Sequence, residues 1–279
     1  MKKISRRSFL AAAGLSVAAL ALTACGGSSA STASSVASSA ASSEAASTSA
    51  VAGELTTVEA GKLTMATNAT FPPYEMTTDA GDIEGIDVET AQAIADKLGL
   101  ELQIDDMDFD AALLSVQQGK ADIVMAGVTV TDERKAVMDF SDSYATGIQS
   151  IIVPEGSDIA SPDDLAGKKI GTQRGTTGYI YCSDDFGDDN VVAYDDGLTA
   201  VQALNNGQVD AVVIDNAPAQ EFIAANPGLK ILDTSYAEED YAIGMAKGSS
   251  LEDAVNAALK ELKADGTLQS IVDKYITAE

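Results

Sequence analysis

The sequence predicts an α/β fold built as two similar lobes. Over about 225 residues, segments typical of buried strands alternate with segments whose apolar residues recur at helical spacing, a pattern that favours mostly parallel sheets covered by helices. The order also repeats: residues 116–124 and 204–212 both run from a helix end through glycine and aspartate into an apolar strand. Gly61-Lys62 and Gly167-Lys168 precede matching strands in the same way. A helix–glycine–strand join is common in α/β proteins, but two repeats in the same order favour two lobes.

The first 24 residues have the pattern of an export signal. Basic side chains at positions 2, 3, 6 and 7 precede the apolar run 9–22, which is short for a membrane-spanning helix. The run ends in Leu22-Thr23-Ala24-Cys25, which resembles the lipobox of bacterial lipoproteins, where the cysteine takes a lipid. The alternative is an ordinary signal peptide with an incidental cysteine. Residues 5–10, SRRSFL, resemble a twin-arginine export signal, and a general secretory signal also fits them.

The composition of residues 25–54 predicts a flexible linker that begins at Cys25, the expected site of lipid attachment. The stretch is almost entirely Ser, Ala, Thr and Gly, which cannot bury enough apolar surface to fold. A chain of this length and composition spans roughly 30 Å on average. We therefore expect the globular part to be held at the extracellular face of the cell membrane.

The elements of the two expected lobes follow from apolar spacing and from glycine stops. In the first half, Gly99 closes a helix whose apolar residues run from Val88 to Leu98. The other expected elements of this half are a strand at 61–67, a helix at 109–116, an apolar strand at 121–128 and a strand at 148–153. The second half repeats the pattern with a strand at 169–172, a helix at 197–206, a strand at 209–214 and a helix at 217–225.

Composition excludes several classes of function. The formal charge is −26 over 279 residues, and a surface this acidic repels nucleic acid and anionic lipid head groups. The chain has no histidine and, besides Cys25, only Cys182. We therefore expect no metal site, no cysteine–histidine nucleophile and no intrachain disulfide, and we expect Cys182 to be a buried apolar side chain.

Residues from about 63 to 275 resemble the extracellular solute-binding proteins of polar amino acid ABC importers, family 3. The joint order and spacing of several short segments carry this resemblance. These segments are 67–75 (TNATFPPYE), 85–89 (GIDVE), 109–113 (FDAAL), 119–122 (GKAD), 129–134 (TVTDER), 140–142 (FSD), 164–168 (DLAGK), 174–177 (RGTT) and 209–215 (VDAVVID). The resemblance implies a type II periplasmic-binding-protein-like fold, whose two lobes are joined by two crossing hinge strands.

Two charged residues match the family's clamp for a free amino acid. The resemblance puts the carboxylate-binding arginine at Arg134, and arginine suits this task because it donates two parallel hydrogen bonds to a carboxylate. It puts the ammonium partner at Asp215. Thr129 and Thr177 match positions that assist through a hydroxyl or a backbone N–H, and Gly127 matches a carbonyl contact. From position alone, Arg134 fits a solvated surface charge and Asp215 fits a helix N-cap equally well.

Four further residues match positions around the ligand's side chain. The resemblance implies that Phe71 and Phe109 enclose that side chain, although periodicity alone would place Phe109 in a core. Asn68 stands where relatives that bind basic amino acids often carry an aspartate, and Gln173 stands at a variable contact. The residues therefore favour a polar or a basic amino acid without deciding between them.

The family's mechanism implies capture by hinge closure, with no cofactor and no catalysis. Lobe 1 is expected at residues 55–150 plus 240–279, and lobe 2 at residues 151–239, with crossing strands near 148–153 and 239–246. The implied partners are the amino acid and the permease of an ABC importer, bound by a monomer. Two alternatives stay open on the same fold: a dehydratase-like enzyme, and a sensory subunit that signals through another chain.

Overall fold

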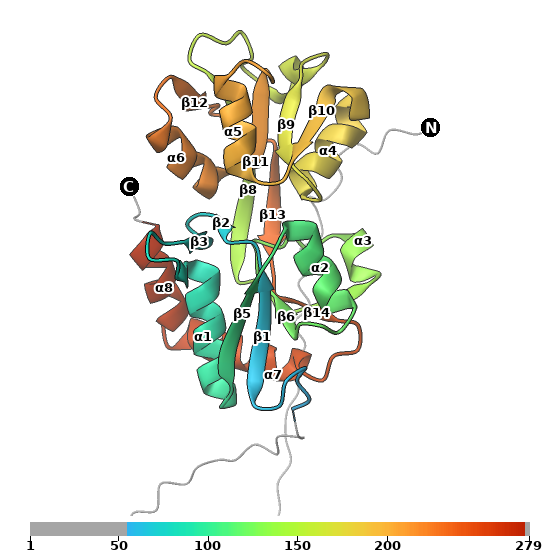
Figure 1. Cartoon of the computed structure of the whole chain (residues 1–279), viewed down its shortest axis with the longest axis vertical. Coiled ribbons are helices and arrows are strands. Elements are labelled where there is room, and N and C mark those ends of the chain that lie inside the picture. Colours follow the sequence, from blue (N-terminus) through green and yellow to red (C-terminus); the bar gives the residue numbers. More distant parts are fainter. Residues whose placement is uncertain (1–54, 277–279) are drawn as a thin grey trace, which may run out of the picture. The chain divides into compact units, whose positions relative to one another are not determined.

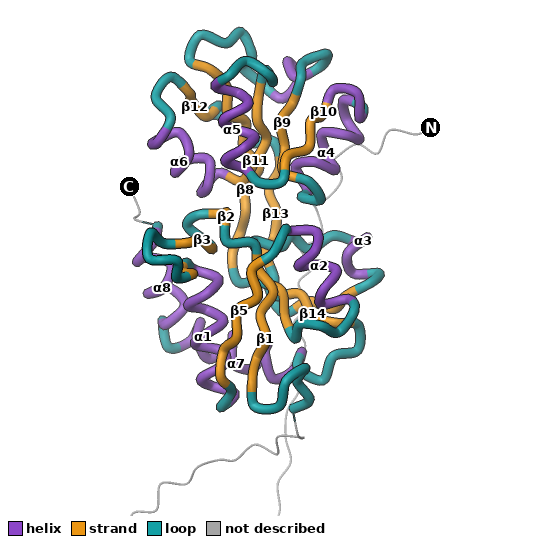
Figure 2. Tube along the Cα trace, viewed as in Figure 1, coloured by secondary structure: helices purple, strands orange, loops and turns teal. Residues whose placement is uncertain are grey.

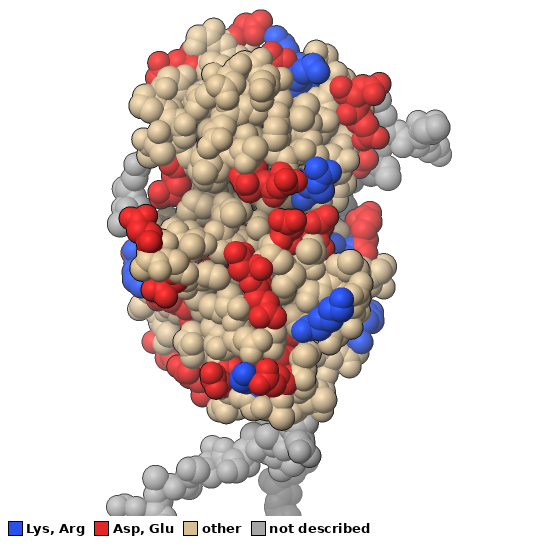
Figure 3. Space-filling model, viewed as in Figure 1, with Lys and Arg blue, Asp and Glu red and all other residues tan. Residues whose placement is uncertain are grey.

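The computed structural model describes residues 55–276. The expected signal sequence 1–24, the lipid attachment at Cys25 and the linker 25–54 lie outside the described residues. Within residues 55–276, no helix is both long and apolar enough to cross a membrane. Acidic side chains are spread over the face of the molecule seen in Figure 3, as the net charge of −26 leads one to expect.

The first sheet belongs to the part that we call lobe 1, in the lower half of Figure 1. Its strand order is β5 (Glu101–Asp106), β1 (Lys62–Thr67), β6 (Ile123–Val124), β14 (Gly244–Ala246) and β7 (Met138–Phe140). The strand β1 is parallel to both of its neighbours, whereas β14 is antiparallel to both of its own. The helices of lobe 1 are α1 (Ile86–Leu98), α2 (Phe109–Gln117), α3 (Asp132–Lys135), α7 (Glu252–Ala264) and α8 (Thr267–Tyr275).

The second sheet belongs to lobe 2, in the upper half of Figure 1. Its strand order is β10 (Val191–Tyr194), β9 (Ile170–Gln173), β11 (Ala211–Asp215), β8 (Ala145–Pro154) and β12 (Leu229–Ile231), and β13 (Ala237–Tyr241) also pairs with β8. Here β9 is parallel to both neighbours and β8 is antiparallel to all of its partners. The helices are α4 (Thr177–Phe186), α5 (Gly197–Asn205) and α6 (Asn216–Ala225), with short 3₁₀ turns at Pro162–Leu165 and Asp188–Asn190.

Two antiparallel strands, β8 and β13, run between the lobes (Figure 2). The first half of β8, from Ala145 to Gln149, pairs with β13, and its second half pairs with β11 and β12. The second crossing strand exists, but the bounds expected for it, 239–246, are wrong. The strand β13 ends at Tyr241, and Gly244 already begins β14 in the sheet of lobe 1. The sheets are therefore mixed rather than mostly parallel, because strands that return from the other lobe enter each sheet in the opposite direction.

The internal repeat has a structural counterpart. In lobe 1, Asp122 accepts a hydrogen bond from the backbone N–H of Thr64 at 2.8 Å, and in lobe 2 Asp210 accepts one from Lys169 at 2.8 Å. Each aspartate follows the repeated glycine and ties the chain to the first part of the neighbouring strand. The repeated sequence pattern thus corresponds to the same join in both lobes.

Apolar side chains fill both lobes. The cluster around α1, α7 and α8 includes Leu63, Ile94 and Leu259, each with no exposed surface, and burial of such a side chain contributes about 1.5–3 kcal/mol. Cys182 is fully buried among apolar side chains of lobe 2, which confirms its expected burial. The helix α1 ends at Gly99 in the left-handed conformation (φ 70°), as the sequence predicted.

The expected strand at 121–128 is wrong in length, although all eight of its residues are buried. Only Ile123–Val124 pair as a strand, between β1 and β14. The chain then turns at Gly127, whose φ of 54° ends the extended backbone. A run of buried apolar residues could not reveal this turn, because burial continues through it.

A small sheet adds the last strands of lobe 1. It is formed by β2 (Thr70–Phe71), β3 (Glu75–Thr77) and β4 (Ile83–Glu84), which pair in antiparallel fashion. This sheet carries Phe71 and Glu75, which both reach the cleft described next.

Candidate functional site

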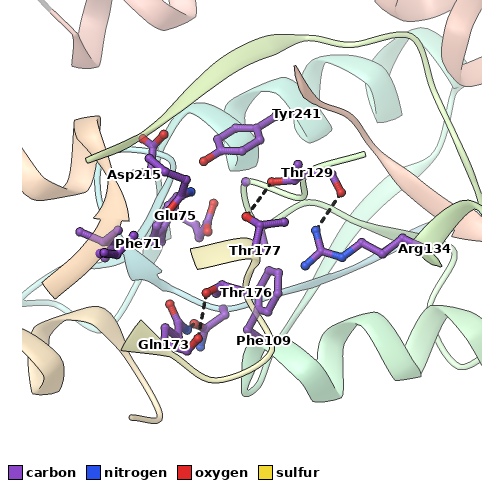
Figure 4. A pocket seen from close by; sticks show the side chains of 16 residues that line it. Phe71, Glu75, Phe109, Thr129, Arg134, Gln173, Thr176, Thr177, Asp215 and Tyr241 are labelled. Atoms are coloured by element: carbon purple, nitrogen blue, oxygen red, sulfur yellow. Dashed lines mark hydrogen bonds between the residues drawn. The ribbon is translucent and has the colours of Figure 1, made fainter. Parts of the chain in front are cut away.

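A cleft with about 440 Å³ of space free of protein atoms collects side chains from both lobes (Figure 4). All nine residues that the sequence singled out line it: Asn68, Phe71, Phe109, Gly127, Thr129, Arg134, Gln173, Thr177 and Asp215. They come from loops and element ends that lie far apart in the sequence, so only the fold brings them together.

Arg134 is buried, with 8 % of its surface exposed, so it is not a solvated surface charge. Its Nη1 donates to the carbonyl of Thr129 at 2.8 Å, and its Nη2 donates to the carbonyl of Gly175, in lobe 2, at 3.2 Å. The guanidinium also lies over the ring of Phe109, 5.4 Å from its centroid. Burial lowers the pKa of Arg134, and the charge of Glu239 opposes that shift. The arginine is therefore a fixed cation in the wall of the cleft.

Asp215 is a helix N-cap and also lines the cleft. It ends β11 and caps α6, since its Oδ1 accepts the N–H of Ala217 at 3.0 Å. Its Oδ2 accepts the N–H of Ile148 on the crossing strand at 2.7 Å. Burial raises the pKa of Asp215 to about 6, while these two backbone N–H groups act in the opposite direction. A nearby cation would favour its ionised form.

Gly127 is required by close packing in the cleft. A Cβ at this position would lie 2.8 Å from the ring of Phe71, and its positive φ also disfavours a side chain. Its N–H donates to Asp87 at 3.0 Å, and the hydroxyl of Tyr144 donates to the same oxygen at 2.8 Å. The position of the Gly127 backbone is thus held by a buried carboxylate beneath the cleft.

Two further polar contacts join the lobes across the cleft, besides the one from Arg134 to Gly175. Gln173 of lobe 2 donates from Nε2 to Oδ1 of Asn68 in lobe 1 at 2.8 Å. The hydroxyl oxygens of Thr129 and Thr177, also from different lobes, lie 3.4 Å apart. The neighbouring Arg174 has a half-exposed side chain that lies 3.6 Å from Asp195, so it faces solvent. The lobes are therefore closed around the cleft.

Sequence reasoning missed several residues of this site. Glu75, Gln149, Thr176 and Tyr241 also line the cleft, and Glu239 contacts its lining from behind. Burial alternates along β13, with Glu239 and Tyr241 buried and their neighbours more exposed. A strand periodicity of two, starting from an aromatic residue, is the signal that could have identified Glu239.

Glu75 is the most unusual of the missed residues. It has no exposed surface, and among the described residues its carboxyl group has only the carboxyl group of Asp87 as a hydrogen-bonding neighbour. Burial and the neighbouring Asp87 raise the pKa of Glu75 well above its ordinary range. Burial likewise raises the pKa of Asp87 to about 6. Burial therefore favours the protonated, neutral form of Glu75 in the folded protein.

The arrangement suits a small molecule that carries both charges. A guanidinium and a carboxylate lie on opposite sides of one cleft, with hydroxyl groups between them and aromatic rings nearby (Figure 4). In the part of the chain that the structure describes, no group of three or more His, Cys, Asp and Glu residues could hold a metal ion.

Comparisons with known proteins agree with this geometry. The profile of the bacterial extracellular solute-binding proteins, family 3, matches residues 63–278. The L-cystine-binding protein TcyJ of Escherichia coli (strain K12) is 34 % identical over 226 residues, which cover 79 % of this chain and 85 % of TcyJ.

Solved structures match over a similar extent. The arginine-, lysine-, histidine-binding protein ArtJ from Geobacillus stearothermophilus superimposes with a TM-score of 0.75 at 34 % identity, covering 78 % of this chain and 96 % of that chain. An ancestral arginine-binding protein bound to glutamine gives a TM-score of 0.74 at 41 % identity, with 78 % and 99 % covered. These matches establish the two-lobed type II periplasmic-binding-protein fold that the sequence predicted.

Proposed function

The chain belongs to the bacterial extracellular solute-binding proteins, family 3, and from this membership we propose that it binds a free polar or basic L-amino acid outside the cell and delivers it to an ABC importer. The observation that carries the proposal is the pairing of Arg134 of lobe 1 with Asp215 of lobe 2 in one cleft. Similar proteins are named for cystine and for arginine, lysine and histidine, and one was solved with glutamine bound. All of these ligands share the same α-carboxylate and α-ammonium groups.

In this proposal the α-carboxylate pairs with Arg134 and the α-ammonium with Asp215. The hydroxyls of Thr129 and Thr177 both donate to Glu239, so they have no proton left for the ligand carboxylate. Thr177 begins α4, where a helix leaves its first backbone N–H groups without intrahelical partners. Backbone N–H groups therefore fit the assisting role better than the hydroxyls do.

The side chain of the ligand would lie by Phe71 and Phe109, with Asn68 and Gln173 at its tip. Neither amide carries a charge, and Asn68 Oδ1 already accepts hydrogen bonds from Thr70 and Gln173. The aromatic rings suit an aliphatic or a guanidinium chain. The residues at this end of the cleft therefore fit the side chain of a polar or a basic amino acid, and they do not distinguish between the two.

Capture would proceed by closure about β8 and β13, with lobe 1 at 55–150 plus 240–279 and lobe 2 at 151–239. A ligand held by residues of both lobes stabilises only the closed form, which is a population shift. The closed monomer would dock on a permease, and a lipid on Cys25 would keep it at the extracellular face of the cell membrane. We propose no catalytic step and no cofactor.

A thermal-shift panel of the common amino acids and L-cystine tests this function. A ligand at 100 times its dissociation constant adds about 2.7 kcal/mol of stability, which raises Tm by about 5–10 °C for a chain of this size. A Tm that none of these ligands raises would contradict the proposal.

Replacing Arg134 tests the clamp itself. Arg134→Ala should reduce affinity for the best ligand more than a hundredfold, because a buried charged hydrogen-bond partner is lost. Lys135→Ala is the matched control, since Lys135 is exposed on the same short helix. Unchanged affinity in the Arg134 variant would refute the carboxylate assignment.

A further inference from the structure

Glu239 is a buried carboxylate behind the cleft, with 7 % of its surface exposed. It lies on the crossing strand β13, where Glu238 and Asp240 are exposed on the opposite face. Tyr241, two residues further along the same strand, packs in the apolar core of lobe 1, whereas Glu239 places a carboxylate at a buried position.

One oxygen of Glu239 collects donors from three parts of the molecule. Its Oε2 accepts hydrogen bonds from Thr129 Oγ1 at 3.1 Å, from Thr177 Oγ1 at 3.0 Å and from Gln149 Nε2 at 2.9 Å. Thr129 belongs to lobe 1, Thr177 begins α4 of lobe 2, and Gln149 lies on β8, the other crossing strand. The other oxygen, Oε1, is buried and has no hydrogen-bond partner among the described residues.

These contacts require the closed arrangement of the lobes. The two threonine oxygens lie 3.4 Å apart, so a single carboxylate oxygen can accept from both. A rotation of one lobe about β8 and β13 would move one threonine away and leave its partner on Glu239. Hydrogen bonds to a charged acceptor weaken steeply once their distance exceeds the normal range.

Glu239 is also linked electrostatically to both ends of the cleft. Its negative charge favours the charged form of Arg134 and disfavours the charged form of Asp215. A zwitterion between these two residues would bring its ammonium toward Asp215, where the negative charge of Glu239 attracts it as well. Ligand binding and the contacts of Glu239 therefore favour the same closed state.

We propose that Glu239 is a positioning residue that holds the closed state by accepting the hydroxyls of Thr129 and Thr177 together, and so slows the release of the ligand. The inference rests on the proposed function of the cleft. In this arrangement the ligand associates with the open form, in which at least one of these contacts is absent. Glu239 therefore affects dissociation and leaves association unchanged.

The test compares the variants E239Q and E238Q, because Glu238 is the exposed neighbour on the same strand. Binding of L-arginine, L-histidine, L-glutamine and L-cystine to the wild-type protein is measured first. The association and dissociation rates of those that bind are then measured for all three proteins by rapid mixing. We expect E239Q to release ligand about tenfold faster, with an association rate and a ligand-free Tm close to wild type, and E238Q to match wild type.

A double-mutant cycle separates coupling from simple damage to the fold. Once Glu239 has lost its charge, T177V should accelerate release less than it does in the wild-type background, because the two changes remove one shared contact. Equal dissociation rates of E239Q and wild type would overturn the inference and leave the proposed function intact. The inference would also be overturned if E239Q had a lowered Tm and lost affinity through a slower association rate. Absence of binding to the wild type would instead contradict the proposed function.

Discussion

The buried position of Asp215 makes ligand affinity depend on pH. With a pKa of about 6, Asp215 is about 90 % ionised at pH 7 but only about 10 % ionised at pH 5. The proposed ammonium contact needs the ionised form, so binding at pH 5 must first remove a proton. The dissociation constant should therefore be about tenfold larger at pH 5 than at pH 7, a difference of about 1.4 kcal/mol.

Isothermal titration calorimetry at pH 5, 6 and 7 measures this change. Arginine and glutamine are the suitable ligands, because neither their α-carboxylate nor their α-ammonium titrates between these values, whereas the side chain of histidine does. Binding at pH 5 should also release a proton, which appears as a dependence of the heat on the buffer.

The variant Asp215→Asn assigns the effect to this carboxyl group. It should bind more than tenfold more weakly at pH 7 and lose most of the pH dependence. Asp87 also has a pKa of about 6 and lies beneath the cleft. A steep pH dependence that survives in Asp215→Asn would thus move the effect to Asp87 and refute the reasoning, as would equal wild-type affinity at pH 5 and 7.

Two predictions concern stability. The pKa of Glu75 is raised in the folded protein, whereas the unfolded chain releases this proton from about pH 4.5 upward, so stability should fall as pH rises above that value, by up to about 1.4 kcal/mol per pH unit. Denaturant unfolding between pH 5 and 8 should show a smaller fall of the unfolding free energy in Glu75→Gln than in the wild type. The exposed control Glu84→Gln should keep the wild-type pH dependence. The same pH dependence in Glu75→Gln would contradict the prediction. Gly147→Ala should lower the free energy of unfolding by about 1–3 kcal/mol, because its Cβ would lie 2.4 Å from the ring of Tyr241. Gly156→Ala, with nothing within 4 Å, should stay near wild type, and equal stability of the two variants would refute the packing argument.

Local sequence patterns predicted the individual elements well where one physical cause dominates. Gly99 ends α1 because only a residue that tolerates a positive φ fits there, and helical spacing sets α2. The apolar run 121–128 predicted burial but not the turn at Gly127, because burial does not distinguish a strand from a bend in the core. The directions of β8 and β14 depend on where the chain crosses from the other lobe, which no local pattern contains.

The sequence alone predicted the two-lobed α/β fold and nine candidate ligand-binding residues, the latter through a family resemblance whose motifs the fold brings into one cleft. Which charges are buried became clear only from the packing of the folded chain. From position alone, Arg134 fitted a surface charge and Asp215 fitted a helix cap with no place in a cleft. In the acidic run at 238–240, only the periodicity of two that leads to Tyr241 separates Glu239 from its exposed neighbours. Desolvation and hydrogen bonding depend on neighbours from distant parts of the chain, which a local sequence pattern does not contain. Glu239 meets Thr129, Thr177 and Gln149 only after both lobes have folded and closed.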